Sequence, residues 1–271
     1  RGGVVAVQTL AHSSAMRGFV TSGLCVLLAA TPLLASGSSA GRRVNDLHVV
    51  ASCGGCDFIM TTDGNLVRSD PQVTCQPTYC TETLKLSNLG LTSLSADVFS
   101  NMTNLVSLDL SNNKLATLTA GVFDTLSSLQ ALSLKNNVLT TLTAGVFDNL
   151  SSLEMLFLGN NQLPSLPGGI FDFDKKLKWL DLNNNLIDTL PLGVFDLLVS
   201  LERLDLPNNK LTNLPPGFFD KVSSLHYLWL YGNPFTCQIT IPGYVEYHVD
   251  SSYYSLPLCG GPEDIWGPLV W

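Results

Sequence analysis

The sequence predicts an α/β solenoid with a parallel β-sheet on its concave face and disulfide caps at both ends. Leucines recur at an unbroken spacing of 24 residues, apolar and polar residues alternate just after each of them as in short strands, and cysteines cluster on both sides of the repeats. A fixed period of this length is typical of stacked units that bury their apolar faces against each other. The leucines that define the period are Leu105, Leu129, Leu153, Leu177, Leu201 and Leu225.

The composition indicates a folded, acidic protein. Hydrophobic residues make up 45% of the chain, charged residues make up 13%, and the formal net charge is -8. That hydrophobic fraction is ample for a buried core. Nucleic-acid binding depends on clustered Lys and Arg, which are missing here, so nucleic acid is excluded as a partner.

The N-terminal segment has the layout of a secretory signal. Residues 1–15 precede the first methionine, Met16, and are interpreted as an upstream or non-native extension. Residues 16–40 combine a basic residue, an apolar run and small residues, which is the pattern of a signal peptide. A signal anchor is the alternative, but the run is short for a bilayer span and contains Pro32. We therefore expect a secreted or extracellular cell-surface protein without a transmembrane helix once the signal is removed.

Six of the seven cysteines lie after the predicted signal peptide, which contains Cys25. These six divide the chain into a cap, a repeat region and a second cap. We expect an N-terminal cysteine-rich cap over 41–80, leucine-rich repeats over 81–233 and a C-terminal cap over 234–271. The four cysteines of the first cap also approach a zinc-ribbon spacing, but disulfides are favoured behind a signal peptide. Their pairing stays open among three possibilities, whereas the second cap offers one pair. The predicted disulfide cysteines are Cys53, Cys56, Cys75 and Cys80, then Cys237 and Cys259.

Two further columns of the repeat are assigned to structure. An asparagine follows each strand, where its amide can bond the backbone of neighbouring turns. A phenylalanine recurs at the same period and should pack as a spine behind the sheet. The first column is Asn113, Asn137, Asn161, Asn185, Asn209 and Asn233, and the second is Phe99, Phe123, Phe147, Phe171, Phe195 and Phe219.

The segments LPLGVFDLLVSL and LPPGFFDKVSSL resemble the "typical" leucine-rich repeats of animal extracellular proteins. LHYLWLYGNPFTC, at the last repeat, most resembles the variable lymphocyte receptors, and Toll-like receptor ectodomains share the same unit. The resemblance implies a leucine-rich-repeat horseshoe with interleaved disulfides in its N-terminal cap. That receptor pattern has Cys-x-Cys after its Asn-Pro, whereas here Cys237 is followed by Gln238 and Ile239.

Strand residues that alternate with the core leucines should face the concave side. Toward the C-terminal end these positions are rich in aromatic, Arg and Asp side chains, a mixture typical of binding hot spots. The alternative is that the rings pack on one another or on the cap. The predicted ligand-binding residues are Met155, Phe157, Trp179, Asp181, Arg203, Asp205, Tyr227, Trp229 and Tyr231.

The sequence also contains patterns that bear on glycosylation, catalysis and metal binding. Asn101 and Asn149 begin N-glycosylation sequons at the same repeat position, on the convex side. No nucleophile with a base, phosphate loop or metalloprotease motif is present, and His226 is interpreted as a surface residue. The aspartates that follow the phenylalanine column could suggest calcium, but solvated or turn-capping acids explain them better. We therefore expect no metal, no cofactor and no enzyme activity.

The sequence thus predicts a secreted or cell-surface module that recognises an extracellular protein or glycan through its concave face. Innate or variable-lymphocyte-receptor-like immune recognition is the sharper version of this hypothesis. A matrix or adhesion component and a secreted enzyme inhibitor are the alternatives.

Overall fold

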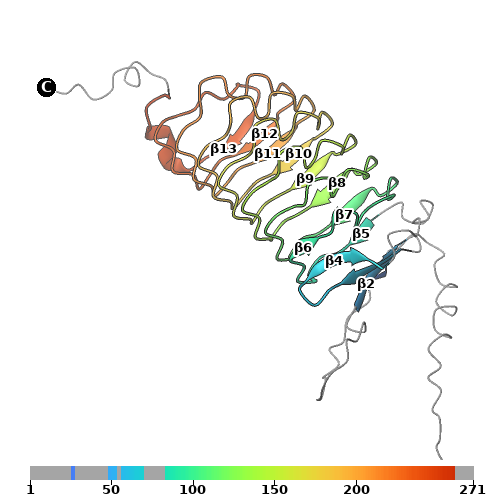
Figure 1. The fold of residues 1–271 in the computed structure, drawn as a ribbon. Helices are drawn as coiled ribbons and strands as arrows, with labels where there is room; N and C mark the ends of the chain where they lie inside the picture. Colours follow the sequence, from blue (N-terminus) through green and yellow to red (C-terminus); the bar gives the residue numbers. More distant parts are fainter. Residues whose placement is uncertain (1–25, 28–47, 54–55, 70–82, 260–271) are drawn as a thin grey trace, which may run out of the picture.

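The computed structural model describes residues 26–27, 48–53, 56–69 and 83–259. These residues form two sheets, one of five strands at the N-terminal end and one of eight strands along the repeats. Figure 1 shows the long sheet as a ladder that runs from β5 to β13 on one side of the solenoid.

The smaller sheet closes the N-terminal end of the stack. β2 and β3 pair antiparallel up to Cys53 and Cys56, and Phe58 of β3 is fully buried against Phe99 of the first repeat, with ring centroids 6.2 Å apart. This hairpin therefore covers the apolar end of the solenoid. The sheet order is β1-β2-β3-β4-β6, with bounds β1 Val26–Leu27, β2 His48–Cys53, β3 Cys56–Met60, β4 Asn65–Arg68 and β6 Ser93–Leu94.

The larger sheet is entirely parallel, with one three-residue strand from each repeat and a last strand, β13, from the C-terminal cap. Equivalent residues pair in register, as in Leu180 with Leu204, so the 24-residue period of the sequence is also the period of the structure. The strands are β5 Thr83–Lys85, β7 Ser107–Asp109, β8 Ala131–Ser133, β9 Met155–Phe157, β10 Trp179–Asp181, β11 Arg203–Asp205, β12 Tyr227–Trp229 and β13 Glu246–His248.

The phenylalanine column forms the predicted spine behind the sheet. The rings of Phe99, Phe123, Phe147 and Phe171 are buried and stack, with centroids 6.1 to 6.4 Å apart. Parallel strands lie only about 4.8 Å apart. Because the repeats are spaced more widely at the spine than at the strands, the sheet curves and becomes the concave face.

The asparagine column forms a buried ladder between repeats, as the sequence predicts. The Asn161 Nδ2 donates to the carbonyl oxygens of Leu134 (3.0 Å) and Leu158 (2.9 Å), and its Oδ1 accepts the backbone N–H of Leu139 at 3.0 Å. The residue before it, Asn160, has φ +56°, a left-handed conformation that Asn tolerates. The ladder thus satisfies backbone groups that the turn leaves without partners in the sheet.

The α part of the predicted α/β class is wrong for the described residues, which contain no α-helix. The convex side consists of consecutive tight turns, in which Asp124, Leu126 and Leu129 each donate their N–H to the carbonyl three residues earlier. Gly121 at φ +75° starts such a series, a conformation that an α-helix does not contain. A parallel sheet with a turn-built back is therefore the observed architecture.

The C-terminal cap adds strand β13, which pairs in parallel with β12, and then the 3-10 helix η2 over Ser251–Ser255. The predicted Cys237–Cys259 disulfide is confirmed. In the N-terminal cap, Cys75 and Cys80 lie outside the described residues, and so does the predicted pairing of that cap. Apart from Val26–Leu27, the same holds for the predicted extension over 1–15 and signal peptide over 16–40.

Candidate functional site

The strand register places the predicted ligand-binding residues in two columns on the concave face. Trp179 of β10 pairs with Arg203 of β11, and Arg203 pairs with Tyr227 of β12. The same register aligns the second column, and Tyr231 lies two residues after the end of β12. The first column consists of Met155, Trp179, Arg203 and Tyr227, and the second consists of Phe157, Asp181, Asp205 and Trp229.

Five of these side chains form one interlocked group, which we call the concave cluster: Phe157, Trp179, Arg203, Asp205 and Trp229. The Phe157 and Trp179 rings meet edge to face at a centroid distance of 5.0 Å. The Arg203 Cζ lies 4.5 Å from the Trp179 ring centroid and 5.0 Å from that of Trp229. Contacts of arginine with indole rings combine dispersion with cation–π attraction. The cluster is thus held by contacts between side chains of the four adjacent strands β9 to β12.

Asp205 holds the side chains of Arg203 and Trp179 in place. Its carboxylate accepts the Nε–H of Arg203 at 2.9 and 3.0 Å, and its Oδ2 accepts the indole N–H of Trp179 at 2.9 Å. The Asp205 residue is only 5% exposed. Burial of a carboxylate is tolerated here because it is paired and hydrogen-bonded. The orientations of both Arg203 and Trp179 therefore depend on Asp205.

A second ion pair extends the cluster toward the middle of the sheet. The Lys135 Nζ lies 2.7 Å from the Asp181 Oδ2, and it also lies 5.9 Å from the Phe157 ring centroid. The Asp181 carboxylate accepts the backbone N–H of Asn183 at 3.0 Å as well. Lys135, two residues after the end of β8, thus reaches across β9 to Asp181 of β10.

The prediction that Asp181 and Asp205 stand exposed beside the rings is wrong, because both carboxylates are covered by their partners. Phe157, Trp179, Arg203, Trp229 and Met155 are half-buried, and Tyr227 and Tyr231 are exposed. The sequence alternative in which the rings pack on one another therefore describes part of the arrangement. It leaves the two tyrosines and the outer edges of the cluster open to solvent.

Sequence reasoning missed the contribution of β13 to this face. His248 pairs in register with Trp229, and the two rings lie 4.9 Å apart. The His248 Nε2 is also 3.3 Å from the Glu246 Oε1. The 24-residue pattern stops before β13, so only the alternation of apolar and polar residues from Tyr244 to Asp250 could have signalled this strand.

One ionisable group lies far from the cluster, on the convex side. Asp174 is 2% exposed, and neither of its carboxylate oxygens has a hydrogen-bond partner among the described residues. Burial, followed by the charge of Asp148, raises the pKa of Asp174 to about 7. Every equivalent position in the other repeats is a buried apolar residue, namely Met102, Leu126, Leu150, Leu198 and Val222.

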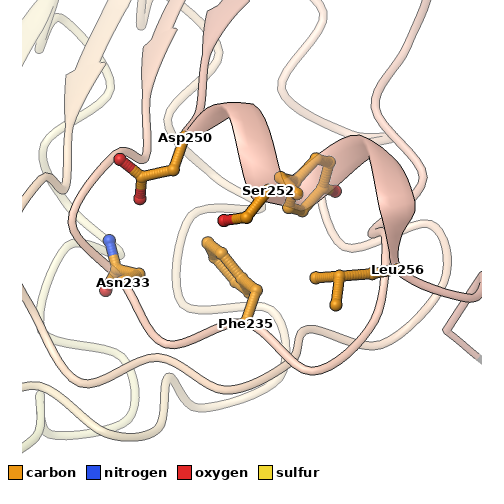
Figure 2. A pocket seen from close by; sticks show the side chains of 6 residues that line it. Asn233, Phe235, Asp250, Ser252 and Leu256 are labelled. Carbon is orange, nitrogen blue, oxygen red and sulfur yellow. The ribbon is translucent and has the colours of Figure 1, made fainter.

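The C-terminal cap contains a small cavity beside the 3-10 helix η2. Figure 2 shows Phe235, Ser252 and Leu256 around it, with Asp250 and Asn233 at one side. The Asp250 Oδ2 accepts the N–H of Gly232 at 2.7 Å. The cavity has room for about 20 Å³, enough for one water molecule and far less than a small-molecule pocket. It does not compete with the concave face as a ligand site.

The described part of the chain contains no group of three or more His, Cys, Asp or Glu side chains arranged to hold a metal ion. It also contains no helix of the length and hydropathy needed to cross a bilayer. Asn101 and Asn149 are both exposed, as glycosylation would require.

The repeat region matches a protein-family model described as leucine rich repeat. The matches overlap and cover residues 81–139, 107–163, 132–187, 156–211 and 175–235. Together they span the larger sheet from β5 to β12. No curated protein matches this chain.

Proposed function

Since the chain belongs to the leucine-rich-repeat family, we propose that it is a secreted or cell-surface binding module that recognises an extracellular protein or glycan through its concave face. Solenoids of this kind present extended concave surfaces that serve for binding. We propose binding rather than catalysis, since no nucleophile and base are arranged together in the concave cluster.

The concave cluster is the observation that carries this proposal. Its Trp and Arg side chains are the types that dominate binding hot spots, and exposed Tyr227 and Tyr231 extend the same surface. The strands before β9 offer only small or singly charged side chains at the equivalent positions, such as Ser107, Ala131 and Ser133. We therefore place the binding surface over β9 to β13.

The fixed geometry of the cluster supports recognition by preformed shape. The contacts of Asp205 with Arg203 and Trp179 hold the polar atoms in place before any ligand arrives. Side chains that are already ordered lose little conformational entropy on binding. A surface of this kind gains affinity without a large rearrangement.

The finer proposal is a role in immune recognition. It is supported by the resemblance of LHYLWLYGNPFTC to the variable lymphocyte receptors. The two sequons add support for secretion, since glycans at Asn101 and Asn149 would lie on the convex side and leave the concave face open.

The full chain, secreted from an animal cell line, is tested against an array of extracellular proteins and glycans beside a Trp179→Ala, Trp229→Ala double variant. We expect the wild-type protein to bind a ligand and the variant to lose at least 100-fold in affinity, because truncation of two hot-spot aromatics costs several kcal/mol.

The control is Phe173→Ala, which removes a side chain that is 60% exposed on the convex side. It should bind as the wild type does. Mass spectrometry of the same preparation checks both sequons for glycans. Equal binding by the wild type and a folded double variant would place the function on another surface.

A further inference from the structure

The Arg203 side chain keeps a set of hydrogen-bond donors that the protein itself does not use. Its Nε donates to Asp205, whereas neither Nη donates a hydrogen bond within the described part of the chain. Neither Nη is among the buried atoms that lack a partner, so both reach solvent. The side chain as a whole is 35% exposed.

The surroundings of Arg203 restrict how a ligand can approach these donors. Trp179 on β10 and Trp229 on β12 flank the guanidinium from the two neighbouring strands, and Asp205 occupies its Nε side. The open side is therefore the edge that carries the two Nη atoms. Their N–H groups lie in the guanidinium plane as a rigid fork, which matches the two oxygens of a carboxylate.

Charge narrows the class of ligand further. Asp205 balances the charge of Arg203, and exposed Glu202 and Glu246 lie on the flanking segments. With a net charge of -8, the chain would repel a polyanion such as a sulfated glycan. A single carboxylate is repelled less than a polyanion, and at short range it gains two charge-assisted hydrogen bonds from the guanidinium.

We propose that the Nη edge of Arg203 binds one carboxylate, and that this carboxylate belongs to a Glu or Asp side chain of a protein ligand. The neighbouring Tyr227 and Tyr231 favour a protein over a sugar acid, since exposed tyrosines beside Trp and Arg are typical of protein interfaces. This inference rests on the proposed function and adds the chemistry of the ligand group.

The test uses the intact protein and three small probes: N-acetyl-glutamate amide, the matching N-acetyl-glutamine amide, and glucuronate. Binding is followed by NMR through the indole N–H signals of Trp179 and Trp229 and the Arg203 side-chain signals. We expect saturable shifts with the glutamate probe in the millimolar range, and at least tenfold weaker binding of the glutamine probe and of glucuronate.

Arg203→Lys keeps the charge but removes the fork, and it should weaken binding of the glutamate probe at least tenfold. Lys210→Ala, an exposed lysine outside the cluster, should bind the probe as the wild type does. A cooperative thermal unfolding transition verifies that each variant is folded.

Equal binding of the glutamate and glutamine probes, or unchanged binding by folded Arg203→Lys, overturns the carboxylate assignment. Binding of glucuronate that equals or exceeds binding of the glutamate probe overturns the assignment of the carboxylate to a protein. Failure here is distinct from failure of the proposed function, because a ligand from the array could still depend on Trp179 and Trp229 when Arg203→Lys has no effect.

Discussion

Asp174→Leu is expected to stabilise the protein by about 4 kcal/mol at pH 8. The carboxyl of Asp174 is buried without a partner, and its pKa is raised from 3.8 to about 7. Each pKa unit corresponds to about 1.4 kcal/mol of difference between the two protonation states. Leucine is also the residue that this column accommodates in neighbouring repeats, so it should fit the space.

The destabilising effect of Asp174 on the folded state should increase with pH. Because the pKa is higher in the folded state, the folded protein binds more protons than the unfolded chain between about pH 4 and pH 7. The contribution of Asp174 to stability therefore becomes more unfavourable as pH rises through this range, and it reaches its full cost above pH 7. The gain from Asp174→Leu should accordingly be much smaller at pH 4.5 than at pH 8.

Urea unfolding at the two pH values measures both effects. Asp174→Asn is the matched control, since it removes the charge but adds no apolar packing. Both variants should lose the same pH-dependent component. If the difference in unfolding free energy between wild type and Asp174→Asn does not change with pH, the carboxyl is solvated and the assignment of its pKa is wrong.

Asn161→Ala is expected to destabilise the protein by about 3 kcal/mol, because it removes one step of the asparagine ladder. The backbone N–H of Leu139 loses its side-chain acceptor and stays buried. The carbonyls of Leu134 and Leu158 each keep a second donor, from Asn137 and Asn185 respectively. The cost therefore arises chiefly from one unsatisfied buried donor and from the space left by the amide.

Urea unfolding at pH 7 measures this loss. Asn160→Gly is the control in the adjacent position. The Asn160 side chain is exposed, and glycine also adopts the positive φ of this residue. It should cost less than about 1 kcal/mol. If both variants lost a similar free energy of unfolding, the hydrogen bonds of the Asn161 side chain would contribute little to stability.

The repeat architecture was predictable because one physical requirement recurs at every turn. The leucines, Phe147 and Asn161 stand at the same place in each 24-residue unit, so the stack, the spine and the ladder follow from the period. The convex side was not predicted correctly. Its turns are set by local glycine conformations and by hydrogen bonds over three residues, which apolar periodicity does not encode.

The candidate site was predictable in position but not in its internal contacts. The alternation of side chains along each strand placed Trp179, Arg203 and Trp229 on one face. It could not indicate that Asp205 lies beneath Arg203, since this depends on which side-chain conformations the neighbouring rings allow. Asp174 was missed because an acidic residue in sequence is normally interpreted as exposed, and only the structure places it in an apolar column.

The most direct test of the central claim is hydroxyl-radical footprinting of the protein with and without a ligand found on the array. Tyr227 and Tyr231 on the concave face are 47% and 38% exposed, whereas Tyr244 and Tyr254 of the cap are 54% and 61% exposed and serve as internal controls. The account predicts that ligand lowers oxidation of Tyr227, Tyr231 and Trp229 and leaves Tyr244, Tyr254 and convex Phe173 unchanged. Protection of Phe173 or the cap tyrosines, with the concave residues still oxidised, would contradict it.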